Sequence, residues 1–230
     1  MPADAYSNSE MPKDSVDAGS AVEPSSKRFD KQQQLRERLI AAGIALFAKK
    51  GFDGTTVSEI AKAAGSSRRT FFRYFKTKDD VVFDWLDEQG EIICDHVSPG
   101  PTTMPPMQNL EEAMLQLARF LDADTSRARL LTHIVYDTPS LARRYQAENS
   151  RWEGEVTKRL MQGRPAKDLF QARVQVAAAT ATMVSAMRAW AADENEKTMR
   201  HWVRQAFRAL RDGGWHDEPE SAPTKRRAKS

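Results

Sequence analysis

Apolar residues recur at helical spacing along most of this chain, between a polar beginning and a polar end. Residues 1–26 are rich in Ser, Asp, Ala and Pro and show no period, so they predict a disordered tail. Residues 215–230 are polar and include four Lys or Arg residues near their end, which predicts a second, basic disordered tail. No run between the tails alternates apolar and polar residues as a strand does. The pattern therefore predicts an all-α protein.

Three helices are expected in residues 27–77. The first carries Leu39 and Phe47 on one face and ends at Gly51, the residue type that most often follows a helix C-terminus. Two shorter helices follow, separated by a turn that contains Gly65. Their candidate N-terminal caps are Thr55 or Thr56, and Ser66 or Ser67. Two short helices around a glycine-containing turn are the pattern of a helix-turn-helix.

Residues 78–214 predict a larger helical body. A Pro- and Gly-containing linker over 98–106 separates a first helix over about 78–97 from several amphipathic helices. The last two helices, about 168–193 and 196–212, carry many apolar residues. A helix that is apolar on several faces has to be covered on more than one side, so these two helices are predicted to form a homodimer interface. The alternative is that they only close the core of the monomer.

The formal net charge of +3 is distributed unevenly along the chain. Residues 27–78 contain 13 Lys and Arg against 4 Asp and Glu, whereas the remaining residues contain 22 basic and 28 acidic side chains. A compact basic segment joined to a mildly acidic body is suited to binding the phosphate backbone of a nucleic acid. A charged surface that merely interacts with water is the alternative.

The residues best suited to read DNA lie at the N-terminal end of the third helix. Ser67, Arg68, Arg69 and Thr70 occupy the end that reaches base edges when such a helix enters the major groove. Arginine reads guanine through paired donors to O6 and N7, and small hydroxyl residues permit close approach and donate to phosphates. One such motif makes few base contacts, so we expect a dimer that reads an inverted repeat in double-stranded DNA.

The segment GFDGTTVSEIAKAAGSSRRTFFRYFKTKDDVV, residues 51–82, resembles the DNA-binding domain of the TetR family of repressors, and the similarity covers roughly residues 31–86. The resemblance implies a helix-turn-helix domain followed by a helical domain that dimerises and senses a small molecule. It also implies repression, because most members block transcription by occupying a promoter. The implied DNA-contacting positions are Thr56, Ser58, Ser67, Arg68, Arg69, Thr70, Phe72, Tyr74 and Lys78. The family often has tyrosine where this chain has Phe72. Because Phe72 has no hydroxyl group, it can make only an apolar contact with DNA.

A small hydrophobic effector is expected in the helical body. The TFFRYF motif and the alanine-rich helix that ends in MRAW resemble the subset of the family thought to bind acyl-CoA-like or other bulky hydrophobic compounds. Met and aromatic residues at helical spacing can line an apolar pocket, although such residues also form ordinary core. The candidate lining residues are Trp85, Met114, Leu117, Phe120, Leu131, Tyr145, Trp152, Met183, Met187 and Trp190. Ligand binding is then expected to release DNA by shifting the population of body conformations.

Two other functions are weighed against this one. A constitutive DNA-binding regulator or activator, whose body only dimerises, fits the same pattern. An all-helical enzyme does not, because the chain contains no HExxH, GxSxG or P-loop motif and its histidines are scattered. Cys94 is the only cysteine, which excludes a multi-cysteine metal site. No metal, cofactor or catalytic residue is therefore expected from these motifs. The adjacent acidic residues Asp193 and Glu194 are interpreted as a solvated helix end.

The cellular compartment follows from what the sequence lacks. It shows no apolar run of membrane-spanning length and no signal peptide at the N-terminus, and a single cysteine excludes an internal disulfide. We therefore expect a cytoplasmic protein with no membrane partner.

Overall fold

A computed structural model describes residues 24–100 and 103–213, with side chains described from residue 31 onward. All regular structure in these ranges is helical, which confirms the predicted all-α class. The helices are α1 (Pro24–Lys50), α2 (Val57–Ala63), α3 (Arg68–Tyr74), α4 (Asp80–His96), α5 (Pro106–Ala123), α6 (Thr125–Asp137), α7 (Pro139–Leu160), α8 (Leu169–Ala191) and α9 (Met199–Asp212), with a short 3₁₀ helix at Ala166–Asp168.

Helix α1 begins earlier than expected. It starts at Pro24, so residues 24–26 of the predicted N-terminal tail are helical. Proline is favoured in the first turn of a helix because the amide it lacks would have no partner there. The rest of that predicted tail and the predicted tail over 215–230 lie outside the described residues.

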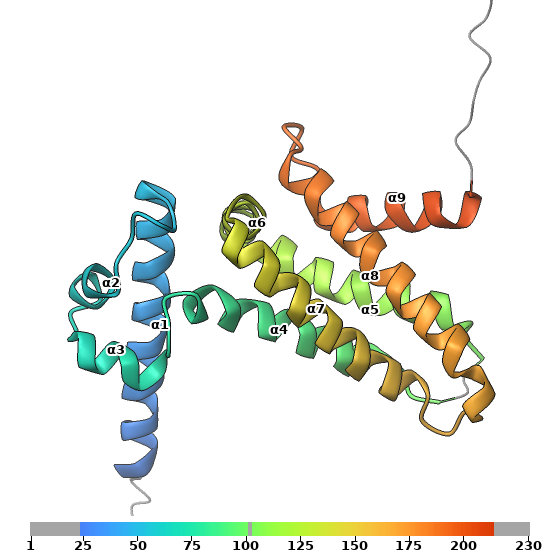
Figure 1. The fold of residues 1–230 in the computed structure, drawn as a ribbon, viewed down its shortest axis with the longest axis horizontal. Coiled ribbons are helices and arrows are strands. Elements are labelled where there is room, and N and C mark those ends of the chain that lie inside the picture. The colour runs from blue at the N-terminus through green and yellow to red at the C-terminus, as the bar shows by residue number, and fades with distance from the viewer. Residues whose placement is uncertain (1–23, 101–102, 214–230) are drawn as a thin grey trace, which may run out of the picture.

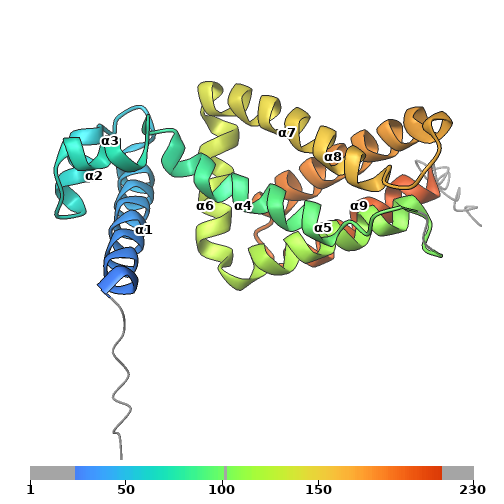
Figure 2. The ribbon, with the colours of Figure 1, turned by 90° about the horizontal axis from the view of Figure 1, so that it is seen from below.

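The helices form two groups, and α4 belongs to both (Figures 1 and 2). Helices α1, α2 and α3 pack together at one end of the molecule, and α5 to α9 form the larger group. Helix α4 packs on α1 at its beginning and on α5 and α7 further along. Helix α6 also contacts α1, which gives the small group a second support on the body.

Buried apolar side chains account for both groups. Leu39, Phe47, Ile60 and Phe71 are buried in the small group, and Val81 adds the first turn of α4 to the same core. Burying a side chain of this size contributes about 1.5–3 kcal/mol relative to leaving it in water. In the larger group the fully buried side chains include Leu110, Leu117, Leu121, Leu131, Leu141, Leu160, Trp190 and Phe207. The apolar residues predicted along the body helices therefore mainly form core.

Three aspartates of α4 pair with arginines of neighbouring helices. Their spacing of four and then three residues places them on one face of the helix. The pairs are Asp80 with Arg144 of α7 (2.9 Å), Asp84 with Arg36 of α1, and Asp87 with Arg151 of α7 (2.7 Å). Partly exposed pairs of this kind each contribute only about 0–1 kcal/mol, so their main effect is to set the position of α4 between α1 and α7.

The interpretation of Asp193 as part of a solvated helix end is wrong, because Asp193 is only 8% exposed. Its carboxylate accepts hydrogen bonds from the backbone amides of Asn195 (2.9 Å) and Lys197 (3.0 Å) and from Nε1 of Trp202 (3.2 Å). These hydrogen bonds, that of the Asn195 amide above all, lower the pKa of Asp193 to about 2. The carboxylate thus orders the loop between α8 and α9. Helical periodicity could not predict these hydrogen bonds, because the donor amides of Asn195 and Lys197 belong to the loop and not to a helix.

Gly90 of α4 allows the indole of Trp152 on α7 to lie directly against the helix. A Cβ atom added at Gly90 would lie 1.9 Å from Cε2 of Trp152, which is far shorter than any real contact. The two helices therefore approach closely only because residue 90 has no side chain.

Replacing Gly90 with Ala is expected to destabilise the protein by about 1–3 kcal/mol, because the added methyl group overpacks the contact with Trp152. This cost outweighs the roughly 1 kcal/mol by which Ala is favoured over Gly inside a helix. The matched control is Gly154→Ala on α7, where nothing lies within 4 Å of the added Cβ and a gain of up to about 1 kcal/mol is expected. Urea unfolding of both variants measures the difference, and equal gains in stability would contradict the interpretation.

Candidate functional site

Helices α2 and α3 form the predicted helix-turn-helix. Gly65 in the turn has φ +66°, in the left-handed region that favours glycine. The backbone amide of Ser66 then donates to the carbonyl of Ala61 (2.8 Å), which closes the end of α2. Phe71 anchors α3 because its side chain is fully buried. The opposite face of α3 is left facing solvent.

The caps of the two short helices are Thr56 and Ser67, which decides between the alternatives that the sequence left open. Thr56 Oγ1 accepts from the Glu59 amide (3.3 Å), and the Glu59 carboxylate accepts from the Thr56 amide (2.9 Å), a reciprocal capping box. Ser67 Oγ accepts from the Thr70 amide (3.1 Å). Hydrogen bonds from Lys50 and then Thr56 lower the pKa of Glu59 from 4.5 to about 2. This contribution to stability is complete above pH 4.5 and is lost as the pH falls towards 2.

The predicted recognition residues lie on the outer face of the motif. Ser67, Arg68 and Arg69 are exposed, and Thr70 is half-buried with its hydroxyl 2.9 Å from Ser67 Oγ. The guanidinium carbon of Arg68 lies 5.6 Å from the ring centroid of Phe72, which is itself 45% exposed. Arg69 forms no hydrogen bond or ion pair with any other described residue. An exposed cationic and aromatic surface of this kind is suited to a polyanionic partner with flat bases.

Three other predicted DNA contacts lie on α2, its cap and the end of α3. Thr56 and Ser58 at the start of α2 are exposed, and Tyr74 at the end of α3 is half-buried. The guanidinium carbon of Arg73 lies 5.2 Å from the Tyr74 ring centroid, and its Nη2 donates to the Tyr74 hydroxyl (3.4 Å). None of these three side chains is fully buried.

Lys78 has a structural role that the sequence did not indicate. It precedes α4, which begins at Asp80, and its ammonium donates to the carbonyls of Phe52 (2.8 Å) and Thr55 (3.2 Å). Lys78 Nζ also lies 4.2 Å from the Phe52 ring centroid. An ammonium has three donors, so one remains for a phosphate. The side chain therefore holds the turn between α1 and α2 in place from the start of α4.

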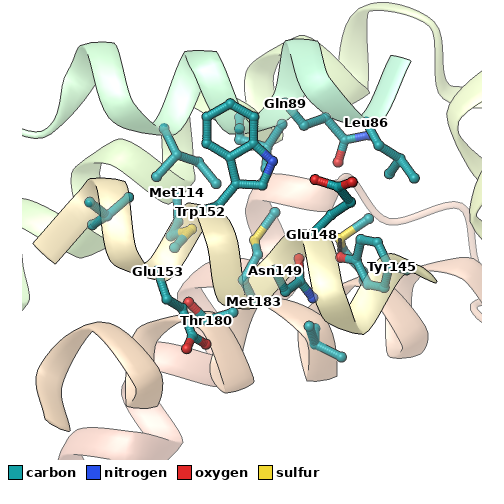
Figure 3. A pocket seen from close by; sticks show the side chains of 16 residues that line it. Leu86, Gln89, Met114, Tyr145, Glu148, Asn149, Trp152, Glu153, Thr180 and Met183 are labelled. Atoms are coloured by element: carbon teal, nitrogen blue, oxygen red, sulfur yellow. Dashed lines mark hydrogen bonds between the residues drawn. The ribbon is translucent and has the colours of Figure 1, made fainter. Parts of the chain in front are cut away.

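A mostly apolar cavity of about 50 Å³ lies between α4, α5, α7 and α8 (Figure 3). Six predicted ligand-lining residues surround it: Met114, Leu117, Tyr145, Trp152, Met183 and Met187. The Tyr145 hydroxyl lies 3.8 Å from Sδ of Met187, and burial raises the pKa of Tyr145, so the phenol stays protonated. Methionine side chains adapt their shape readily, so the volume of this cavity can change without a change of fold.

The other four residues predicted to line the pocket do not border this cavity. Leu131 and Trp190 are fully buried, Trp85 is 5% exposed, and Phe120 packs half-buried against the core. The guanidinium carbon of Arg129 lies 5.2 Å from the Trp190 ring centroid. These positions are part of the packed core, because helical spacing marks a residue as inward-facing without showing which inward face borders free space.

Sequence reasoning missed the polar residues of the cavity. They are Gln89, Glu148, Asn149, Glu153 and Thr180. Gln89 is only 4% exposed, and its Nε2 atom has no hydrogen-bond partner among the described residues. Glu148 accepts a hydrogen bond from Nε of Arg151 (2.7 Å). The one available signal was a glutamine amid the apolar positions of α4, and a single polar residue in a helix is too common to indicate a site.

The part of the chain that the structure describes holds neither a metal site nor a membrane span. No three His, Cys, Asp or Glu side chains there come together in a way that would hold a metal ion. None of the described helices is both long enough and apolar enough to cross a membrane.

The fold and its exposed basic helix define a helix-turn-helix regulator, and comparison with protein families agrees. Residues 39–84 match the model of bacterial regulatory proteins of the tetR family, and residues 104–214 match the model of the MftR C-terminal domain. The two matches together span more than half of the chain. The protein belongs to the tetR family of bacterial transcriptional regulators.

Relatives of known name are distant. The transcriptional regulator TcmR of Streptomyces glaucescens is 28% identical over 172 residues, which are 71% of this chain and 76% of TcmR. The regulator AcrR of Shigella flexneri is 29% identical over 114 residues, 48% of this chain and 52% of AcrR. The structure of the regulator FadR of Bacillus subtilis in complex with stearoyl-CoA aligns with a TM-score of 0.55 at 17% identity, covering 78% of this chain and 99% of FadR. At that identity the likeness shows a shared fold.

Replacing Lys78 with Ala is expected to lower the free energy of unfolding by about 1–3 kcal/mol, because two backbone carbonyls lose a charged donor. The matched control is Lys76→Ala, since Lys76 is exposed and its side chain has no hydrogen-bond or ion-pair partner among the described residues. Thermal unfolding of both variants measures the effect. If Lys78→Ala weakened DNA binding while leaving stability unchanged, the side chain would contact only phosphate.

Proposed function

We propose that the protein is a homodimeric repressor that binds a palindromic operator through its helix-turn-helix and is released by a small hydrophobic ligand. The observation that carries the proposal is the exposure of Arg68 and Arg69 at the N-terminal end of α3, in a chain of the tetR family.

The proposed reading of DNA rests on the geometry of α3. Its first turn carries two exposed arginines with no carboxylate partner among the described residues, so pairing with guanine breaks no internal ion pair. Ser67 and Thr70 beside them are small, and their hydroxyl groups suit contacts to phosphate oxygens. The ring of Phe72 supplies an apolar surface that matches a thymine methyl group or a sugar.

The proposed homodimer rests mainly on α8. Phe170 is 78% exposed and Val174 is 52% exposed, and exposed Ala177 and Ala181 continue the same line at helical spacing. An apolar stripe of this length on the surface is typical of an interface. Helix α9 buries its main apolar residues within the chain, and its Leu210, 41% exposed, adds to the free surface.

The proposed response to ligand rests on α4. This helix borders the cavity through Leu86, Gln89 and Gly90, and its first turn packs into the core of the helix-turn-helix group through Val81. A ligand that prefers one spacing of α4 and α7 will therefore favour one position of the recognition helices. The solved complex of the similarly folded FadR with stearoyl-CoA supports a hydrophobic ligand.

Replacing Arg68 or Arg69 with Ala is expected to weaken binding to the specific operator by about 1–3 kcal/mol each and to relax its sequence preference. Binding to unrelated duplexes is expected to change little by comparison. The control is Arg143→Ala, which removes an equal charge from an exposed position on α7. Fluorescence anisotropy with an operator selected from random duplexes measures the affinities. If Arg143→Ala weakens binding equally, the surface of α3 does not read bases.

Replacing Val174 with Glu is expected to convert a dimer into a monomer of 25.9 kDa, because it places a charge in the proposed apolar interface. The control is Ala147→Glu, which adds the same charge to an exposed position of α7. Light scattering after size exclusion gives the mass. A dimer that survives Val174→Glu at micromolar concentration would place the interface elsewhere.

A further inference from the structure

We infer that the ligand of the cavity is an aromatic organic cation that also carries a hydrogen-bond acceptor oxygen. This inference rests on the proposed ligand-binding function and adds the chemical class of the ligand. It depends on the charges that line the cavity, on one buried amide and on the space around Trp152.

The charges that line the cavity are negative. Its lining includes the carboxylates of Glu148 and Glu153 but no lysine, arginine or histidine. Arg151 neutralises Glu148 from outside the cavity, through the 2.7 Å contact to Nε. Glu153 is half-buried and forms no hydrogen bond or ion pair with another described residue. A ligand cation would give this carboxylate a partner, whereas an anion would be repelled and would lose its hydration.

Gln89 supplies the second recognition element. Its side chain lines the cavity, only 4% of the residue is exposed, and its Nε2 has no acceptor among the described residues. A buried amide donor without a partner costs free energy, so a ligand that places an ether, carbonyl or hydroxyl oxygen there recovers that cost. In the view of Figure 3, Gln89 and Glu148 lie on one side of Trp152, and Glu153 and Thr180 lie on the other.

The space between these two polar elements is suited to an aromatic ring. Trp152 borders it as a flat surface, and Met114, Met183 and Met187 line it with polarisable sulfur-containing side chains. The free volume of about 50 Å³ is smaller than a ligand requires, so binding has to move side chains. Met114, Met183 and Trp152 can move without breaking a side-chain hydrogen bond to another described residue, whereas Met187 accepts one from the Tyr145 hydroxyl.

A wider surface groove adjoins the cavity at Glu153, and its charges raise the competing possibility of a CoA ester. Its lining includes Lys158 and Arg173, which would attract the phosphates of a CoA ester whose acyl chain entered the cavity. Lys158 already pairs with Glu155 (2.7 Å), and any such ester would have to pass the carboxylate of Glu153. The charges therefore favour a cation over a CoA ester.

Isothermal titration calorimetry of the full chain tests the inference with three ligands that share one naphthyl ether. The probes are 2-(1-naphthyloxy)ethylamine, 2-(1-naphthyloxy)ethanol and 1-naphthyloxyacetate, with lauroyl-CoA as the competing class. We expect the amine to bind about tenfold more tightly than the alcohol, because its charge reaches Glu153, and the carboxylate to bind most weakly. Lauroyl-CoA is expected to bind more weakly than the amine.

Two variants locate the recognition elements. Glu153→Gln is expected to remove the tenfold difference between amine and alcohol, and Gln89→Leu is expected to weaken both by a similar factor of about five. The matched control is Glu91→Gln, an exposed carboxylate of α4 outside the cavity, which should leave the order unchanged. If a variant fails to fold, the order of affinity of the three probes for the unaltered chain still tests the inference.

The inference is overturned if the carboxylate or lauroyl-CoA binds as tightly as the amine, or if no naphthyl ether binds. The release of operator is measured separately, by anisotropy of labelled duplex in the presence of each probe. If the amine binds in the expected order without releasing the duplex, the ligand class stands and ligand-controlled release fails. If lauroyl-CoA alone releases the duplex, ligand-controlled release stands and the ligand class fails.

Discussion

The position of α4 is the constraint on which the rest of the structure depends, because this one helix has to fit two cores at once. Its first turn inserts Val81 among the buried residues of α1 and α2, and its middle part borders the cavity and contacts α7 through Gly90. Asp84 pairs with α1, and Asp80 and Asp87 pair with α7. The two cores are therefore joined through one continuous helix, packed at one end on α1 and further along on α5 and α7.

The ion pairs of α4 differ in what they contribute. Asp80 is partly buried, which by itself raises its pKa, but the amide of Thr77 and the guanidinium of Arg144 outweigh burial and hold the pKa below its ordinary value. The guanidinium carbon of Arg144 also lies 4.0 Å from the Phe83 ring centroid. Arg144 therefore joins α7 to α4 through charge and through an aromatic contact. Such a pair tolerates small shifts, because each component weakens gradually with distance.

The sequence predicted the helix-turn-helix well because its signals are local. The candidate caps Thr55 or Thr56 and Ser66 or Ser67, and Gly65 between the helices, act over one helical turn each. The cavity was predicted only in part. Helical spacing marked Met183 and Leu131 equally as inward-facing, yet Met183 borders the cavity and Leu131 is packed in core. That difference depends on how four helices cross, and the importance of Gln89 depends on which donors its neighbours supply.

The contact between Gly90 and Trp152 also constrains how the sequence can evolve. Any side chain at position 90 collides with the indole of Trp152. A smaller residue at position 152 causes no collision with Gly90 and only enlarges the cavity. A larger residue can therefore replace Gly90 only after a smaller residue has replaced Trp152. Descendants of such a change would have a wider cavity before α4 gained any new side chain, so the shape of the cavity can change before the sequence of α4 does.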